Sequence, residues 1–167
     1  MVSLSQLTLR LAEPLLPLGR HIPFTLQRLL LEQLMARWLA EPLAAGDFDL
    51  LQGRCLRLVI EDLGLAWNLT RGRLGLQLSE HGQADVCIRG NWRAFLLLAS
   101  RQEDPDTLFF RRRLVIEGDT ELGLAIKNLL DSLDPDNLPP RLWHSLQSLG
   151  RAAAGFDLDQ GALNPQR

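Results

Sequence analysis

The chain has 167 residues, of which 46% are hydrophobic and 23% charged, and its formal net charge is −2. This length favours one domain with a hydrophobic core, and the nearly balanced charge offers no broad attraction for nucleic acid or an anionic membrane. The two cysteines, Cys55 and Cys87, lie far apart without a CxxC pair, which argues against a disulfide framework and against a zinc site.

Residues 1–22 are apolar, but two prolines and a glycine prevent one long helix. Arg10 and Glu13 interrupt any signal-peptide core. No uncharged apolar run approaches the roughly 20 residues that a membrane span requires. We therefore expect an apolar leader on a soluble, cytoplasmic protein.

A helix is expected in "PFTLQRLLLEQLMARWLAEP", between Pro23 and Pro42. Apolar residues occupy most of its circumference and leave only a narrow polar stripe. A helix of this kind needs to be covered on most of its sides.

From about residue 54 the hydrophobic period changes to two. Apolar and polar residues alternate in four segments, separated by glycine-containing turns, at 56–61, 65–70, 73–79 and 86–88. The series predicts an antiparallel meander with one buried face.

The pattern then returns to helix at 92–100, with Asn91 as the N-cap. A loop or single turn is expected at 101–107. The remaining segments are a strand at 113–117, a helix at 120–133, an amphipathic helix at 139–150 and a disordered tail at 151–167.

This order predicts an α+β fold, in which helices cover the apolar face of a largely antiparallel five-stranded sheet. The corresponding division of the chain is a leader at 1–22, a main domain at 23–135, a C-terminal helix at 136–150 and the tail at 151–167.

Motifs for catalysis are scarce. The three histidines share no metal-ligand spacing, and the chain has no nucleophile elbow, dinucleotide fingerprint or P-loop. The acidic clusters at 103–106 and 117–121 are typical of helix caps. Catalysis by Glu103, Asp104 or Asp119 is therefore the weakest hypothesis, and we expect neither an enzyme nor a metal site.

Three consecutive arginines, Arg111–Arg113, precede the predicted strand. In an extended segment they would point to alternate faces, so they could not form a one-sided cationic patch. This favours a solvated start of the strand, paired with the acidic residues of 103–106, over an anionic head-group site. The acidic start of the following helix also disfavours a bound anion there.

The helices carry more apolar surface than a simple core requires. The residues alone leave two interpretations open: a tightly packed core with a dimer or partner interface, or a lipid-binding cavity with a membrane-docking surface.

Residues 103–134, "EDPDTLFFRRRLVIEGDTELGLAIKNLLDSLD", resemble one branch of the sterol carrier protein type 2 family, the bacterial ubiquinone biosynthesis accessory factors of the UbiT type. Three further segments support this resemblance and follow one another in the expected order: "PFTLQRLLLEQLM", "GDFDLLQGRCLRLVIEDLGLAWNL" and "ADVCIRGNWRAFLLLASRQEDPDTLFF". The resemblance covers roughly residues 20–135.

This resemblance implies a carrier fold with an apolar lipid cavity between sheet and helices, and no cofactor, catalytic residue or metal. The implied ligand is a polyprenyl quinone precursor, with phospholipid as a competing cargo. The implied partners are the hydroxylase proteins UbiU and UbiV, in oxygen-independent ubiquinone synthesis. Peripheral contact with the inner membrane and a homodimer are left open.

The candidate lipid-binding residues come from the first long helix, the sheet, the later helices and the Phe-Phe pair. They are Leu30, Leu34, Trp38, Trp67, Leu76, Phe95, Leu96, Phe109, Phe110, Leu122, Ile126 and Leu129. The alternative function is a protein-interaction scaffold or dimerisation module that has no lipid cavity.

Overall fold

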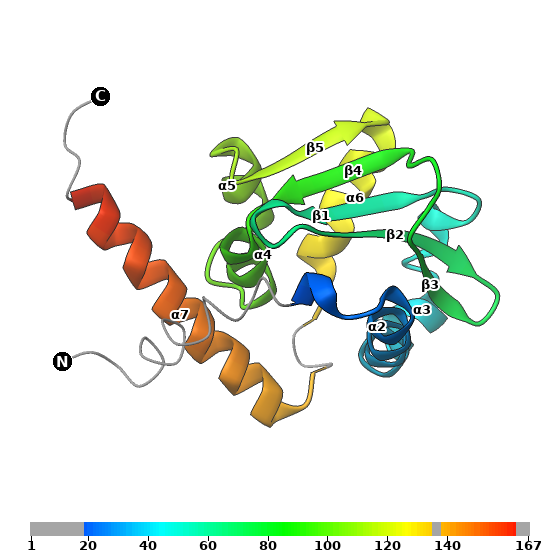
Figure 1. The fold of residues 1–167 in the computed structure, drawn as a ribbon, viewed down its shortest axis with the longest axis horizontal. Helices are drawn as coiled ribbons and strands as arrows, with labels where there is room; N and C mark the ends of the chain where they lie inside the picture. The colour runs from blue at the N-terminus through cyan, green and yellow to red at the C-terminus, as the bar shows by residue number, and fades with distance from the viewer. Residues whose placement is uncertain (1–18, 135–137, 163–167) are drawn as a thin grey trace.

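A computed structural model describes residues 19–134 and 138–162. The predicted leader therefore lies largely outside the described residues, as does the end of the predicted tail. The elements, in chain order (Figure 1), are α2 Phe24–Trp38, α3 Ala40–Ala45, η2 Asp49–Leu51, β1 Leu56–Ile60, η3 Glu61–Leu63, β2 Leu65–Gly72, β3 Gly75–Ser79, β4 Val86–Gly90, α4 Trp92–Ala99, α5 Pro105–Phe110, β5 Leu114–Gly118, α6 Thr120–Ser132 and α7 Pro140–Ala162.

The five strands form one sheet in the order β3-β2-β1-β4-β5. The predicted α+β class with five strands is confirmed, but the largely antiparallel meander is wrong, because β1 and β4 pair in parallel at the centre of a mixed sheet. The Asp85 carboxylate accepts the Cys55 N–H at 2.7 Å, and the Asp85 N–H donates to the Cys55 carbonyl at 2.9 Å. These bonds hold the starts of β4 and β1 side by side, so the two strands run in the same direction.

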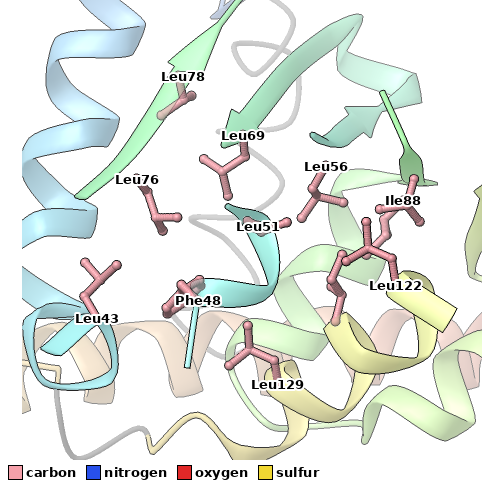
Figure 2. Packing of buried hydrophobic residues seen from close by; sticks show 12 residues of the cluster. Leu43, Phe48, Leu51, Leu56, Leu69, Leu76, Leu78, Ile88, Leu122 and Leu129 are labelled. Carbon is pink, nitrogen blue, oxygen red and sulfur yellow. The ribbon is translucent and has the colours of Figure 1, made fainter. Parts of the chain in front are cut away.

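The core lies on one face of the sheet, where leucines from the strands meet α3, η2 and α6. Figure 2 shows Leu51 of η2 between Leu56 and Leu69 of the sheet and Leu122 and Leu129 of α6. Leu51 is only 1% exposed. This cluster fills the space between the sheet and the helices, so the space for a ligand has to be sought beside it.

Helix α7 continues to Ala162, so the disordered tail predicted from residue 151 is wrong for residues 151–162. The predicted helix stopped at residue 150, but Gly150 lies within α7 and allows a close contact. A Cβ at Gly150 would lie 2.0 Å from Ser100 Oγ at the end of α4. The buried Ala152 and Ala153 also pack with the α4 side of the core, so small residues hold α7 against α4.

The segment before β5 contains the short helix α5, where a loop or single turn was predicted for residues 101–107. Asp104 accepts the Thr107 N–H at 2.7 Å, and Pro105 occupies the first turn of α5, where its missing N–H costs nothing. Arg112 has a φ of 55°, and Arg113 N–H returns to the Leu108 carbonyl at 2.9 Å. The arginines thus form the turn after α5 and do not alternate along a strand.

The expected pairing of this turn with the preceding acidic cluster is confirmed for one residue. Glu103 Oε1 lies 3.7 Å from Arg111 Nη1 and 3.5 Å from Arg113 Nη1. The arginines therefore mark a solvated turn that leads into β5.

Candidate functional site

An apolar groove of about 430 Å³ lies between α2, α4 and the C-terminal end of α6, beside the main core. We call it the α2–α4 groove. Apart from two polar residues at its rim, its lining consists of Leu31, Leu34, Met35, Trp38, Leu39, Phe95, Leu98, Ala99, Leu130, Leu133 and Leu138.

The groove follows from the way α4 and α2 divide their apolar residues. The Asn91 side chain accepts the Ala94 N–H at 2.8 Å and so begins α4. Ala94 and Leu97 are fully buried, which leaves Phe95 and Leu98 half-buried on the neighbouring side. Helix α2 has no fully buried residue, so its apolar side chains remain available to line the groove.

Arg101 and Asp134 form the polar rim of the groove. Arg101 adopts a φ of 55° directly after α4. Its Nη2 donates to the Asp131 carbonyl at 3.1 Å and also to the Leu133 carbonyl. A cation that binds the last carbonyls stabilises a helix C-terminus, so Arg101 joins α4 to the end of α6. The groove thus combines an apolar interior with a charged rim, an arrangement that suits an amphipathic ligand.

Three of the predicted residues, Leu34, Trp38 and Phe95, come together in this groove. Leu30 lies on the outer side of α2 and is 50% exposed. Phe110, at the end of α5, is 90% exposed and points away from the core.

The other predicted residues are placed elsewhere. Four of them, Leu76, Leu122, Ile126 and Leu129, are buried in the main core. Trp67 packs against that core and donates its Nε1–H to Gln27 Oε1 at 2.9 Å. Leu96 packs against the cluster that joins α4 to α7, and Phe109 lines a second groove, along β5.

Sequence reasoning missed several groove residues, among them Met35, Leu98, Leu130 and Leu133. Met35 shares a side of α2 with Leu31, and Leu98 follows Phe95 by three residues. A search for helix faces that remain apolar after the core positions are assigned would have found them.

The outer side of α2, together with Ile22 just before the helix, carries a row of exposed apolar residues, which we call the α2 row. Ile22, Leu26, Leu29, Leu30 and Leu34 are 42%, 47%, 54%, 50% and 38% exposed. Contiguous apolar exposure of this kind marks a site for a ligand, a membrane or a partner protein. Leu34 belongs both to this row and to the groove, so the two surfaces are continuous. None of the helices within residues 19–134 and 138–162 has the length and hydropathy to cross a membrane.

The carboxylates considered for catalysis serve local structure. The pKa of Asp104 lies below its usual range because its carboxylate accepts hydrogen bonds from the Thr107 hydroxyl and N–H. The pKa of Asp119 is lowered first by the Leu122 N–H at the start of α6 and further by Arg54, 3.0 Å away. In the described part of the chain, no three His, Cys, Asp or Glu residues gather where they could hold a metal ion.

The sequence of this chain is similar to that of known proteins. The SCP-2 sterol transfer family matches residues 31–131. The ubiquinone biosynthesis accessory factor UbiT of Escherichia coli (strain K12) is 42% identical over 120 residues, which cover 72% of this chain and 69% of that protein, and UbiT of Escherichia coli O157:H7 gives the same values.

A solved structure also matches the fold. The UbiJ-SCP2 ubiquinone synthesis protein superposes with a TM-score of 0.53 and 21% identity, over 65% of this chain and 97% of that one. At this identity the likeness concerns the fold alone.

Proposed function

This chain belongs to the SCP-2 sterol transfer family, and from that premise we propose that it is a non-enzymatic accessory factor of ubiquinone biosynthesis that binds the isoprenoid tail of ubiquinone precursors. The observation that carries the proposal is the α2–α4 groove, whose interior is apolar and whose rim holds Arg101 and Asp134. The similarity to UbiT supports the choice of pathway.

The tail lies along Leu34, Trp38 and Phe95, and the polar ring lies toward Arg101. The groove of about 430 Å³ falls within the range of about 300–1,000 Å³ that is usual for small-molecule sites. A groove of this size holds only part of a long prenyl chain. The guanidinium of Arg101 offers hydrogen-bond donors to oxygen atoms on the ring. A phospholipid presents the same combination of apolar chain and oxygen-rich head, so it competes for the same groove.

The energetics suit a carrier. Burying one methylene contributes about 0.8 kcal/mol, so about ten enclosed carbons contribute roughly 8 kcal/mol before ordering costs. This corresponds to a dissociation constant near micromolar at best. Such affinity allows the protein both to take up a nearly insoluble precursor and to release it.

The α2 row is the place where cargo exchanges with a membrane surface, since it is exposed and runs into the groove at Leu34. The protein stays outside the hydrocarbon core and contacts the inner membrane peripherally. Partner hydroxylases of the UbiU and UbiV type then receive the precursor with its ring presented at the rim, in oxygen-independent synthesis.

A second candidate function rests on the same exposed row. If the α2 row packs against another protein, the chain is an interaction scaffold or a dimerisation module and the groove is part of that interface. The two functions differ in one observable property, the presence of a lipid in the isolated protein.

The test is extraction of protein purified without detergent, followed by mass spectrometry of the organic phase. The carrier function predicts an isoprenoid or phospholipid near one molecule per chain, and saturable uptake of an added prenylated quinone after the lipid is removed. Absence of both lipid and uptake would refute it. Light scattering on the lipid-free protein then tests the dimerisation module, which requires an oligomer whose formation depends on the α2 row.

A further inference from the structure

The two edge strands of the sheet, β3 and β5, differ in what packs against them. At the β3 edge, α2 packs on the strand and Glu32 Oε1 accepts the Leu78 N–H at 2.8 Å. At the other edge, within the described residues, β5 pairs with β4 alone. A groove of about 610 Å³ runs along all of β5, between Phe109 and Arg112 on one side and Thr120, Leu124 and Lys127 of α6 on the other. An uncovered strand edge is a template for another strand.

The register shows which main-chain groups face this edge groove. Asp119 N–H donates to the Asp85 carbonyl at 2.9 Å, and β4 pairs with β5 in antiparallel register. In such a ladder the bonded pairs alternate, so Val115 and Glu117 point their N–H and C=O groups toward β4. The main-chain groups of Leu114, Ile116 and Gly118 consequently point outward, into the edge groove.

The charges around β5 are arranged so that the strand complements itself. Arg112 precedes the strand, whereas Glu121 follows it. Arg111 and Asp119, at the same two ends, are already paired with Glu103 and Arg54 within the chain. In an antiparallel pair formed by two copies, the basic start of one strand lies beside the acidic end of the other. If Ile116 is opposite Ile116 of the second copy, Leu114 lies opposite Gly118. The turn that holds Arg112 then lies near the start of α6 of the second copy, which holds Glu121.

Helix α6 is placed to join the same contact. A Cβ at Gly123 would lie 2.7 Å from Ile116 Cγ2 and 3.5 Å from Val86 Cγ2, so the N-terminal part of α6 lies across β4 and β5. Adjacent strands are about 4.8 Å apart, so a two-fold axis outside β5 puts the N-terminal parts of the two α6 helices roughly 10 Å apart. Helices pack at about 8–10 Å. Leu124, which is 55% exposed on the groove side of α6, would be covered by this packing.

We propose that the chain forms a homodimer through β5, in which two copies pair antiparallel about Ile116 and their α6 helices pack together. The two five-stranded sheets then become one sheet of ten strands. This contact is separate from the α2–α4 groove, because the groove is lined by Leu130 and Leu133 at the C-terminal end of α6, whereas the dimer contact uses Leu124 in its first half.

Charge reversal tests the pairing through light scattering and sedimentation. Arg112→Glu places two acidic ends together and Glu121→Arg two basic ends, so each variant alone is expected to dimerise about tenfold more weakly than the wild type. An equimolar mixture of the two restores opposite charges at both ends and forms a heterodimer of wild-type affinity. Arg73→Glu, on the turn near the other edge of the sheet, leaves the dimer unchanged. A mixture no tighter than its components would overturn the proposed pairing.

Hydrogen exchange supplies a test without substitutions. The Val115 and Glu117 amides are expected to be protected at all protein concentrations, because they bond to β4. The Ile116 amide is expected to gain protection only at concentrations where the mass is that of a dimer. A protein that stays monomeric at millimolar concentration overturns the proposal, as does a dimer in which the Ile116 amide exchanges as fast as in the monomer.

Discussion

Filling the α2–α4 groove without disturbing the core is expected to block lipid uptake. Ala99 is suited to this, because it is the last residue of α4, is exposed to solvent and lines the groove. In Ala99→Trp the indole occupies space that the prenyl chain would otherwise fill, whereas the helix keeps its N-cap and its buried residues.

The size of the effect follows from the buried carbon. If the indole excludes about half of a ten-carbon segment, roughly five methylenes lose their contact, at about 0.8 kcal/mol each. The loss of about 4 kcal/mol raises the dissociation constant close to a thousandfold. The stability of the fold should change little, because the substitution is made at an exposed position.

The assay is titration of the lipid-free protein with a short-chain prenylated quinone, monitored by quenching of tryptophan fluorescence. Ala36→Trp is the matched control: Ala36 is exposed on α2 and does not line the groove, so this variant should bind like the wild type. Equal affinities for Ala99→Trp and Ala36→Trp would show that the ligand lies elsewhere.

Three further predictions concern the elements around the groove. Gly150→Ala should lower the free energy of unfolding by about 1–3 kcal/mol, because the new Cβ meets Ser100 Oγ, and adding Ser100→Gly should recover much of the loss in urea denaturation. Asn91→Ala removes the α4 cap and should cost about 1 kcal/mol in the same measurement. Because the pKa of Asp119 is lowered in the folded chain, its contribution is present above its unfolded pKa of about 3.9 and lost as pH falls through the lower folded value. Asp119→Asn should therefore flatten the acid limb of the stability–pH curve, and an unchanged limb would contradict this assignment.

Much of the fold was predictable because it depends on local patterns. The alternation in β1, β2 and β3 and the caps Asn91 and Asp119 indicated strands and helix starts correctly. The parallel pairing of β4 with β1 was not predictable from alternation, because it depends on the non-local bonds between Asp85 and Cys55. A period of two shows which face of a strand is buried but not which strand lies beside it.

The ends of helices and strands were predicted least well. One error lies at Gly150 in α7, and the other lies at Arg111–Arg113 before β5. The last helix was predicted to stop at residue 150, whereas α7 continues past Gly150 and uses its missing side chain to approach Ser100. Arg111–Arg113 were interpreted as part of an extended segment, whereas Arg112 takes a left-handed conformation that few non-glycine residues adopt.

The candidate site could be predicted only in part, since the sequence does not say which apolar residues a core will use. Leu122 and Ile126 have the same helical periodicity as the groove residues Leu34 and Trp38, yet they face the sheet and are buried. The difference lies in how α6 and α2 are oriented against their neighbours. The family resemblance led to the proposed kind of ligand, and the packing of the helices led to the candidate place for it.

Photolabelling with a prenylated quinone analogue that carries a diazirine on its tail tests the central claim most directly. After irradiation and proteolysis, the proposed function predicts saturable labelling of α2 and α4, at residues such as Leu34, Trp38 and Phe95, with competition by unlabelled prenylated quinone. Labelling confined to the β5 groove or to α7, or labelling that unlabelled quinone does not displace, would contradict it.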